Sequence, residues 1–94
     1  MHTIHVPPKV AKAIRKLDLP LQRMLKEKFQ KIAESPHKGD ALTKDLLGLW
    51  SYHFSYRGVA YRIIYEIYEE KLLVLIILVG ARENIYERLR RRRR

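Results

Sequence analysis

Cysteine is absent from the sequence, so neither a disulfide framework nor a thiolate metal site can form. Nothing therefore points to an oxidising compartment, and we expect a cytoplasmic protein. The four glycines, Gly39, Gly48, Gly58 and Gly80, stand apart from one another, which excludes a glycine-rich phosphate loop and a dinucleotide-binding fingerprint. We expect no nucleotide cofactor.

Long apolar runs are also scarce. The one long run, residues 72–79, is far short of the roughly 20 residues that a membrane-spanning helix needs. The N-terminal residues lack the charged start, apolar stretch and small-residue cleavage site of a signal peptide. We therefore expect no membrane span and no export. The histidines at positions 2, 5, 37 and 53 are scattered, without metal-ligand spacing beside a carboxylate, so we also expect no metal.

Acidic residues are outnumbered by basic ones. The chain has 20 Lys and Arg against 10 Asp and Glu, which gives a formal net charge of +10. Such a field concentrates polyanions and repels basic partners. Three kinds of partner fit: nucleic acid bound through its phosphates, an anionic membrane surface, or an acidic protein that neutralises this one. Charge alone does not decide among them.

The length of 94 residues allows a single domain, residues 1–94, because so short a chain can close only one modest core. Residues 3–6 alternate between apolar and polar and predict a short strand, after which two prolines suit a helix start. Apolar residues then recur every three or four positions, from 10 to 17 and from 21 to 32, which predicts two amphipathic helices. Between them, Asp18-Leu19-Pro20 breaks and recaps the chain, so we expect a helical hairpin ending near Ser35-Pro36.

Beyond an expected loop at 37–45, the apolar period changes to two. Residues 50–57 and 59–68 alternate as strands with one apolar face do, and Arg57-Gly58 forms the turn between them. Residues 72–79 are apolar on both faces and predict a strand inside the sheet, which Gly80 ends. Residues 81–94 predict a short helix and a solvated, flexible basic tail at 90–94. This order predicts an α+β fold in which a helical hairpin packs against a three-stranded antiparallel meander.

A candidate site lies on the polar face of the predicted sheet. The aromatic residues of the strand at 50–57 must face the helices, because that face buries most apolar area, so His53 points away from the core. The same alternation puts Arg62 on the face that His53 occupies. Arg82 follows the last strand, and Tyr86 lies one helical turn further on. We expect these four residues around one rim.

Such a set suits cleavage of RNA without a metal. The reaction needs a base to deprotonate the ribose 2′-hydroxyl, guanidinium groups for the pentavalent phosphate, and an acid or positioning hydroxyl. Histidine can serve as the base or the acid, arginine binds phosphate, and tyrosine stacks or donates its hydroxyl. Simpler interpretations are a solvated His53 and a Tyr86 that caps the core. Arg62 could form a surface ion pair with Glu66.

Four segments resemble the RelE/ParE toxin superfamily along nearly the whole chain. They are Glu34-Ser35-Pro36, Leu46-Leu47-Gly48-Leu49-Trp50-Ser51-Tyr52, Tyr61-Arg62-Ile63-Ile64-Tyr65-Glu66-Ile67 and Val79-Gly80-Ala81-Arg82-Glu83-Asn84-Ile85-Tyr86. The resemblance implies a RelE-like fold and a toxin held inactive by a co-encoded, RelB-like antitoxin. RelE-like members cut messenger RNA in the ribosomal A site, whereas ParE-like members poison DNA gyrase. Operator DNA is expected as a partner only through the antitoxin complex.

The same resemblance implies roles for the candidate residues. Arg62 and Arg82 match arginines that bind and stabilise the phosphate in RelE-like enzymes, and Tyr86 matches the tyrosine that stacks on the substrate base. The best-known RelE pattern has lysines near positions 51 and 53, one of which acts as the base. In this chain His53 would replace that lysine.

Further basic residues are candidates for phosphate contacts. Lys44 and Arg57 could bind the RNA backbone, and the region from Arg88, including Arg90, could anchor ribosomal RNA. The tail could equally be a solvated end or an arm that packs against an acidic antitoxin. Three functions therefore stay open: an RNA-cleaving toxin, which we favour, a gyrase inhibitor, and a non-catalytic module that binds only its antitoxin or operator DNA.

Overall fold

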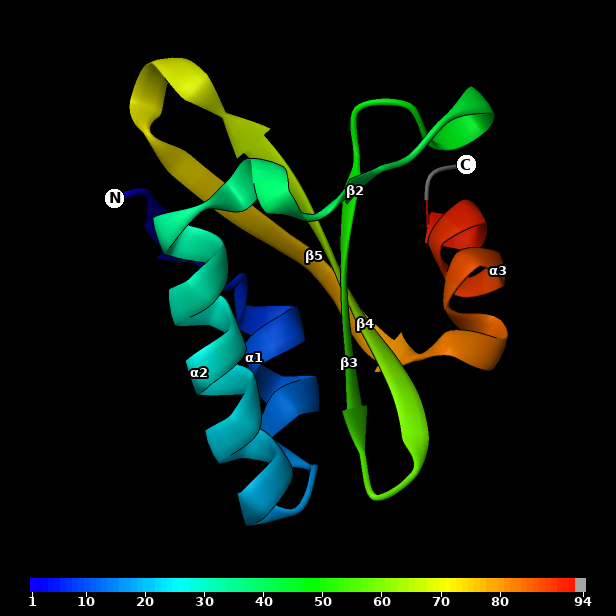
Figure 1. Ribbon diagram of the computed structural model, residues 1–94. Coiled ribbons are helices and arrows are strands. Elements are labelled where there is room, and N and C mark those ends of the chain that lie inside the picture. The colour runs from blue at the N-terminus through cyan, green and yellow to red at the C-terminus, as the bar shows by residue number, and fades with distance from the viewer. Residues whose placement is uncertain (93–94) are drawn as a thin grey trace.

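The computed structural model describes residues 1–92, in which three α-helices and a five-stranded sheet enclose one hydrophobic core on each face of the sheet. Helices α1 and α2 lie on one side of the sheet and α3 lies on the other (Figure 1). The predicted α+β fold is confirmed. The elements are β1 (Thr3–His5), α1 (Pro8–Arg15), α2 (Leu19–Glu34), η1 (Pro36–Lys38), β2 (Asp40–Ala41), η2 (Lys44–Leu46), β3 (Trp50–Tyr56), β4 (Val59–Tyr68), η3 (Glu69–Lys71), β5 (Leu73–Ala81) and α3 (Arg82–Arg92).

The helical hairpin forms as predicted, and its apolar residues face the sheet. Val10 of α1 and Leu21 and Leu25 of α2 are buried there. Asp18 occupies the N-cap position of α2, but its carboxylate does not cap the helix. It instead accepts a hydrogen bond from the Tyr56 hydroxyl at 3.0 Å, which ties the hairpin to β3. No helix within residues 1–92 combines the length and the apolar character needed to span a membrane.

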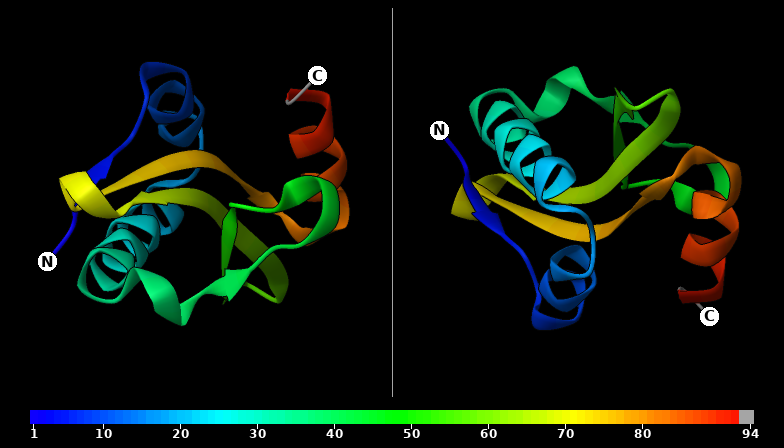
Figure 2. Two further views of the ribbon diagram at one scale, coloured as in Figure 1. Left: turned by 90° about the horizontal axis from the view of Figure 1, so that it is seen from above. Right: turned by 90° about the horizontal axis from the view of Figure 1, so that it is seen from below.

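The strands follow the order β1-β5-β4-β3-β2 across the sheet. The meander of β3, β4 and β5 is antiparallel, as predicted, and β1 joins it in parallel beside β5. Strand β5 therefore has a neighbour on both sides, which confirms the interior position expected from its two apolar faces. Viewed from above and below, α1 and α2 lie near one end of the strands and α3 lies near the other end (Figure 2).

Three boundaries differ from the prediction. The expected loop at 37–45 contains β2, whose two residues pair with β3 and were too few to show a period. Gly80 does not end the last strand, because β5 continues through it to Ala81. The arginines at 90–92 are the last turn of α3 and not a tail, since Ile85 and Leu89 are fully buried and hold this helix against the sheet. The rest of the predicted tail, residues 93–94, lies outside the described residues.

The turn between β3 and β4 sets the register of the site. Arg57 and Gly58 both have positive φ angles, 49° and 78°, as a two-residue hairpin turn requires. Tyr56 is therefore paired with Val59, and counting back along the strands places His53 directly opposite Arg62.

Candidate functional site

His53 and Arg62 are paired residues on neighbouring strands, and they lie on the sheet face that α1 and α2 leave open. The side chain of His53 is 47% exposed, so the imidazole is accessible from solvent. Arg62 is half-buried at the centre of β4. The structure thus brings together the histidine and the arginine that the strand alternation placed on one face.

The guanidinium group of Arg62 is partly buried without an anionic partner. Its Nε and Nη1 atoms are shielded from solvent and have no hydrogen-bond partner among residues 1–92. The ion pair with Glu66 that the sequence allowed is absent from that part of the chain. The Cζ atom of Arg62 instead lies over the ring of Tyr86, 5.7 Å from the ring centre, in a cation–π arrangement.

Arg82 begins α3 beside this pair and is exposed. Burial, followed by the positive charges of Arg62 and Arg82, lowers the pKa of His53 below its ordinary value of 6.5, while the carboxylate of Asp40 opposes the change. A lowered pKa keeps the imidazole neutral at pH 7. The site therefore combines a neutral proton acceptor with two fixed positive charges.

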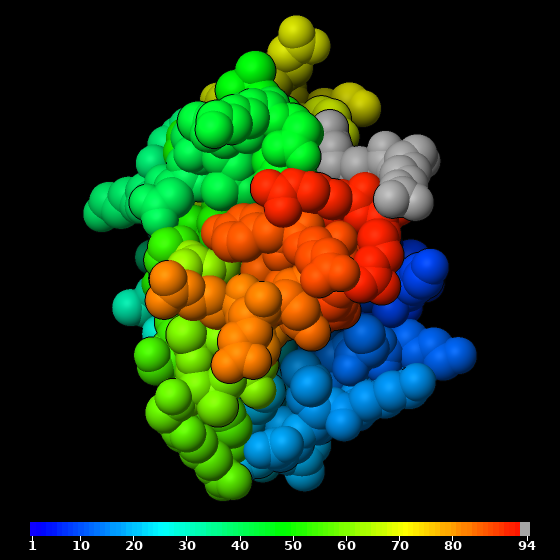
Figure 3. Space-filling model, turned by 90° about the vertical axis from the view of Figure 1, so that its right-hand side faces the viewer, coloured from blue at the N-terminus to red at the C-terminus, as the bar shows by residue number. Residues whose placement is uncertain are grey.

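A hollow of about 700 Å³ adjoins Arg82, between the β3–β4 hairpin and the start of α3. Its lining comes from residues 58–60 of the hairpin and 81–83 of the strand–helix junction. In Figure 3, which faces the α3 side of the molecule, α3 in orange and red lies beside the lime hairpin. The hollow leaves room for an extended ligand next to the arginine.

Asp40 is a site residue that the sequence analysis missed. It stands on β2, and its Oδ2 lies 3.0 Å from Nε2 of His53. The segment around Asp40 has no periodicity, so its pairing with β3 could not be predicted. Within residues 1–92, no group of three or more histidine, cysteine, aspartate or glutamate residues is placed to hold a metal ion.

The four candidate phosphate contacts do not gather at this site. Arg90 donates to Asp45 at 2.8 Å, which ties η2 to α3. Arg57 lies over the Tyr56 ring, on the side of the sheet that faces the helical hairpin, and Lys44 is exposed in η2. Arg88 lines a separate groove. The roles of these four residues toward RNA stay predictions.

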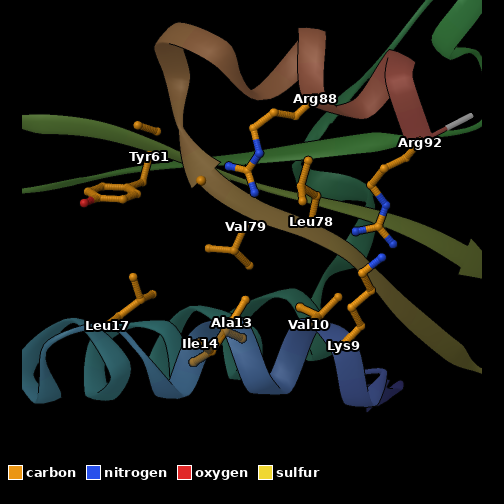
Figure 4. A pocket seen from close by; sticks show the side chains of 12 residues that line it. Lys9, Val10, Ala13, Ile14, Leu17, Tyr61, Leu78, Val79, Arg88 and Arg92 are labelled. Atoms are coloured by element: carbon orange, nitrogen blue, oxygen red, sulfur yellow. The ribbon is translucent and has the colours of Figure 1, made fainter.

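The groove lies between α1, the end of β5 and α3, beyond the point where β1 stops covering β5. It has a volume of about 380 Å³ and an apolar floor that includes Val10, Ile14 and Leu78. Arg88 and Arg92 reach into it from α3, and Arg92 points toward Lys9 on α1 (Figure 4). None of these three cations forms an ion pair within residues 1–92.

Comparison with known proteins identifies relatives over most of the chain. Residues 4–90 match the family model of the ParE-like toxin of type II bacterial toxin-antitoxin systems. The mRNA interferase toxin RelE of Escherichia coli strain K12 is 34% identical over 71 residues, which cover 74% of this chain and 72% of that protein.

Solved structures give the same result. The fold matches a chain of the intact E. coli RelBE toxin-antitoxin complex with a TM-score of 0.69 and 25% identity, over 88% of this chain and 99% of that one. It also matches a chain of the RelBE2 toxin-antitoxin complex of Mycobacterium tuberculosis with a TM-score of 0.72 and 26% identity, over 86% and 98%. The similarity thus extends from the sequence to the arrangement of the helices and the sheet.

Proposed function

Because the chain belongs to the ParE-like toxins of type II bacterial toxin-antitoxin systems, and is RelE-like in sequence and fold, we propose that it is an endoribonuclease that cuts messenger RNA on the ribosome. The observation that supports this proposal most strongly is the unpaired guanidinium group of Arg62. A relative of this chain is named an mRNA interferase. The proposal extends that activity to this chain through its own residues.

Arg62 needs an anion. A partly buried cation without hydrogen bonds for two of its nitrogens destabilises the fold, because the lost hydration is not replaced. Arg82 adds a second positive charge nearby, so a monovalent anion would still leave the site positive. A phosphodiester in its pentavalent transition state has two negative charges, which matches two guanidinium groups. The site therefore favours the transition state of phosphoryl transfer over its ground state.

His53 supplies the proton acceptor. In the proposed reaction, the ribose 2′-oxygen forms a bond to phosphorus while the bond from phosphorus to the 5′-oxygen breaks. The 2′-hydroxyl proton passes to His53, the 5′-oxygen takes a proton from water, and His53 then gives its proton to the hydroxide so formed. Because the pKa of His53 is lowered below 6.5, its imidazole is neutral at pH 7 and is free to accept that proton. Tyr86, which lies beside Arg62, presents an aromatic ring on which a base can stack.

The proposed protein partner is a cognate, RelB-like antitoxin. Both solved relatives described above are toxin–antitoxin complexes. The groove between α1 and α3 is suited to an acidic, amphipathic segment of such a partner. Its floor is apolar, and its three cations, Lys9, Arg88 and Arg92, lie within one cavity that has no acidic residue in its lining.

The proposal is tested by inducing the protein in cells without the antitoxin and mapping the 5′ ends of messenger RNA. We expect new ends within translated regions, in phase with codons, for the wild type. Arg62→Ala should abolish these ends and relieve growth arrest. Arg23→Ala, a matched control, removes an exposed arginine from α2 on the opposite side of the sheet and should retain both effects. Growth arrest with intact transcripts and damaged DNA would instead indicate gyrase inhibition.

A further inference from the structure

The contact between His53 and Asp40 is defined by the sheet. Asp40 pairs with Ser51 across β2 and β3, and His53 lies two residues further along β3 on the same face. The carboxylate is therefore a diagonal neighbour of the imidazole, and Oδ2 and Nε2 are 3.0 Å apart.

The short strand β2 is fixed by contacts of the residues that precede it and of the residue that follows it. Before it, the buried Tyr65 hydroxyl donates to the carbonyl of Pro36 at 2.6 Å, and Gly39 lies directly against that hydroxyl. After it, the backbone N–H of Leu42 donates to the carbonyl of Leu49 at 2.9 Å. The backbone at Asp40 is thus anchored to the sheet, which places its carboxylate beside His53.

The contact determines which nitrogen of His53 bears a proton. A carboxylate can only accept hydrogen bonds. A hydrogen bond between the two groups therefore requires the proton on Nε2, which leaves the lone pair of a neutral imidazole on Nδ1.

We propose that Asp40 is a positioning residue, which holds His53 as the tautomer whose Nδ1 takes the proton from the ribose 2′-hydroxyl. The inference rests on the proposed ribonuclease function and adds a residue to it. Asp40 acts through His53 and does not touch the RNA. When His53 accepts the proton, it becomes a cation near the positive charges of Arg62 and Arg82, and the carboxylate stabilises that cation.

A simpler role for the pair would be a surface contact of little energetic consequence. The side chains of His53 and Asp40 are 47% and 67% exposed, and exposed pairs of this kind contribute little to stability. The two roles differ in what they predict. A surface contact shifts the pKa of His53 at most and leaves the maximal rate of cleavage unchanged, whereas a positioning carboxylate also sets that maximal rate.

The test replaces Asp40 by Asn and follows His53 by NMR titration and RNA cleavage by single turnover on programmed ribosomes. Charged groups from three elements face His53: Asp40 on β2, Arg62 on β4 and Arg82 on α3. Asp40→Asn removes the one carboxylate among them, so we expect the pKa of His53 to fall further. The acid limb of the rate profile should move to lower pH, and the maximal rate should fall by about tenfold or more. Asp40→Glu should recover part of that rate.

A second histidine–carboxylate pair provides the control. Glu69 accepts from Nε2 of His37 at 2.8 Å with comparable exposure, and it lies beyond the end of β4. Glu69→Gln removes the same charge and should leave the pKa of His53 and the cleavage rate unchanged.

Two failures can be told apart. If the wild type cuts RNA and Arg62→Ala does not, yet Asp40→Asn keeps the wild-type maximal rate, the positioning role is overturned, whether or not the pKa of His53 shifts. If the wild type cuts no RNA while Asp40→Asn still shifts the His53 pKa, the His53–Asp40 contact stands and the ribonuclease function is wrong.

Discussion

The guanidinium carbon of Arg62 lies 5.7 Å from the centre of the Tyr86 ring, so the middle of β4 is joined to α3. Helix α3 is itself fixed by Ile85 and Leu89, which are fully buried in the core that includes Ile64 of β4. The packing of α3 on the sheet therefore sets the position of the arginine. The Tyr86 ring contacts Arg62 and also packs against the core that holds α3. Cleavage and the packing of α3 should therefore be coupled.

Replacement of Tyr86 separates the contribution of its ring from that of its hydroxyl. Tyr86→Phe keeps the ring over Arg62 and should retain most of the cleavage rate. Tyr86→Ala removes the cation–π contact and part of the packing of α3, so it should lower the rate by about tenfold or more and the free energy of unfolding by about 1–2 kcal/mol. Single-turnover cleavage and urea unfolding measure the two effects. Equal losses of rate in both variants would show that the hydroxyl, and not the ring, is required.

The pKa of His53 reports the charges around it. Burial and the charges of Arg62 and Arg82 hold it below 6.5, so Arg62→Ala should raise it toward that value. The folded state disfavours the charged imidazole, so the unfolded state binds a proton at His53 first as the pH falls below 6.5. The free energy of unfolding therefore decreases as the pH falls from 6.5 through the lowered pKa of His53. Titration of the imidazole by NMR in both proteins measures the shift. A His53 pKa that is the same in Arg62→Ala and the wild type would disprove the electrostatic coupling.

Gly39 is required by the close approach of Tyr65. A Cβ atom at position 39 would collide with the buried Tyr65 hydroxyl. Gly39→Ala should therefore lower the free energy of unfolding by roughly 1–3 kcal/mol, the usual cost of overpacking. In a Tyr65→Phe background the oxygen is gone, so the same substitution should cost less. Urea unfolding of the four proteins tests this, and an undiminished cost in the double variant would contradict the assigned clash.

Because Tyr65 is buried, we expect the free energy of unfolding to fall at alkaline pH. Burial raises the pKa of Tyr65 to about 12, whereas a tyrosine in an unfolded chain titrates near pH 10. As the pH rises from 10 to 12, the unfolded state loses its proton first, so the free energy of unfolding falls. By about pH 11 the loss from this group should reach about 1 kcal/mol.

The measurement is urea unfolding at about pH 9 and about pH 11. Tyr65→Phe should show a smaller decrease between the two pH values than the wild type. Tyr68→Phe, which changes an exposed tyrosine at the end of β4, should behave as the wild type does. The same decrease in all three proteins would show that Tyr65 titrates normally.

The side of the sheet on which each strand residue lies was predictable from the sequence. Two-residue alternation in β3 and β4 placed His53 and Arg62 on one face, and the structure confirms this placement. The helical hairpin was equally predictable, because apolar residues repeat at helical spacing over two segments. Both patterns are local in sequence. Only the choice of the buried face depends on residues far away in the chain.

The contacts of Asp40 and of Arg90 were not predictable. The two residues of β2 are positioned by Tyr65, which lies 25 residues further along the chain, through its hydrogen bond to Pro36 and its contact with Gly39. Arg90 looked like a free cation in a basic tail, yet it pairs with Asp45 once α3 is packed. The sequence of a basic run does not indicate which of its arginines will pair with an acidic residue elsewhere in the chain.

We propose that this site cleaves RNA by attack of the internal 2′-hydroxyl. The most direct test is the chemistry of the cut ends, determined after purified protein acts on ribosomes programmed with a defined messenger RNA. We expect a 2′,3′-cyclic phosphate on the upstream fragment and a 5′-hydroxyl on the downstream fragment for the wild type, and neither product with Arg62→Ala. A 3′-hydroxyl with a 5′-phosphate, or uncut RNA from active ribosomes, would contradict it.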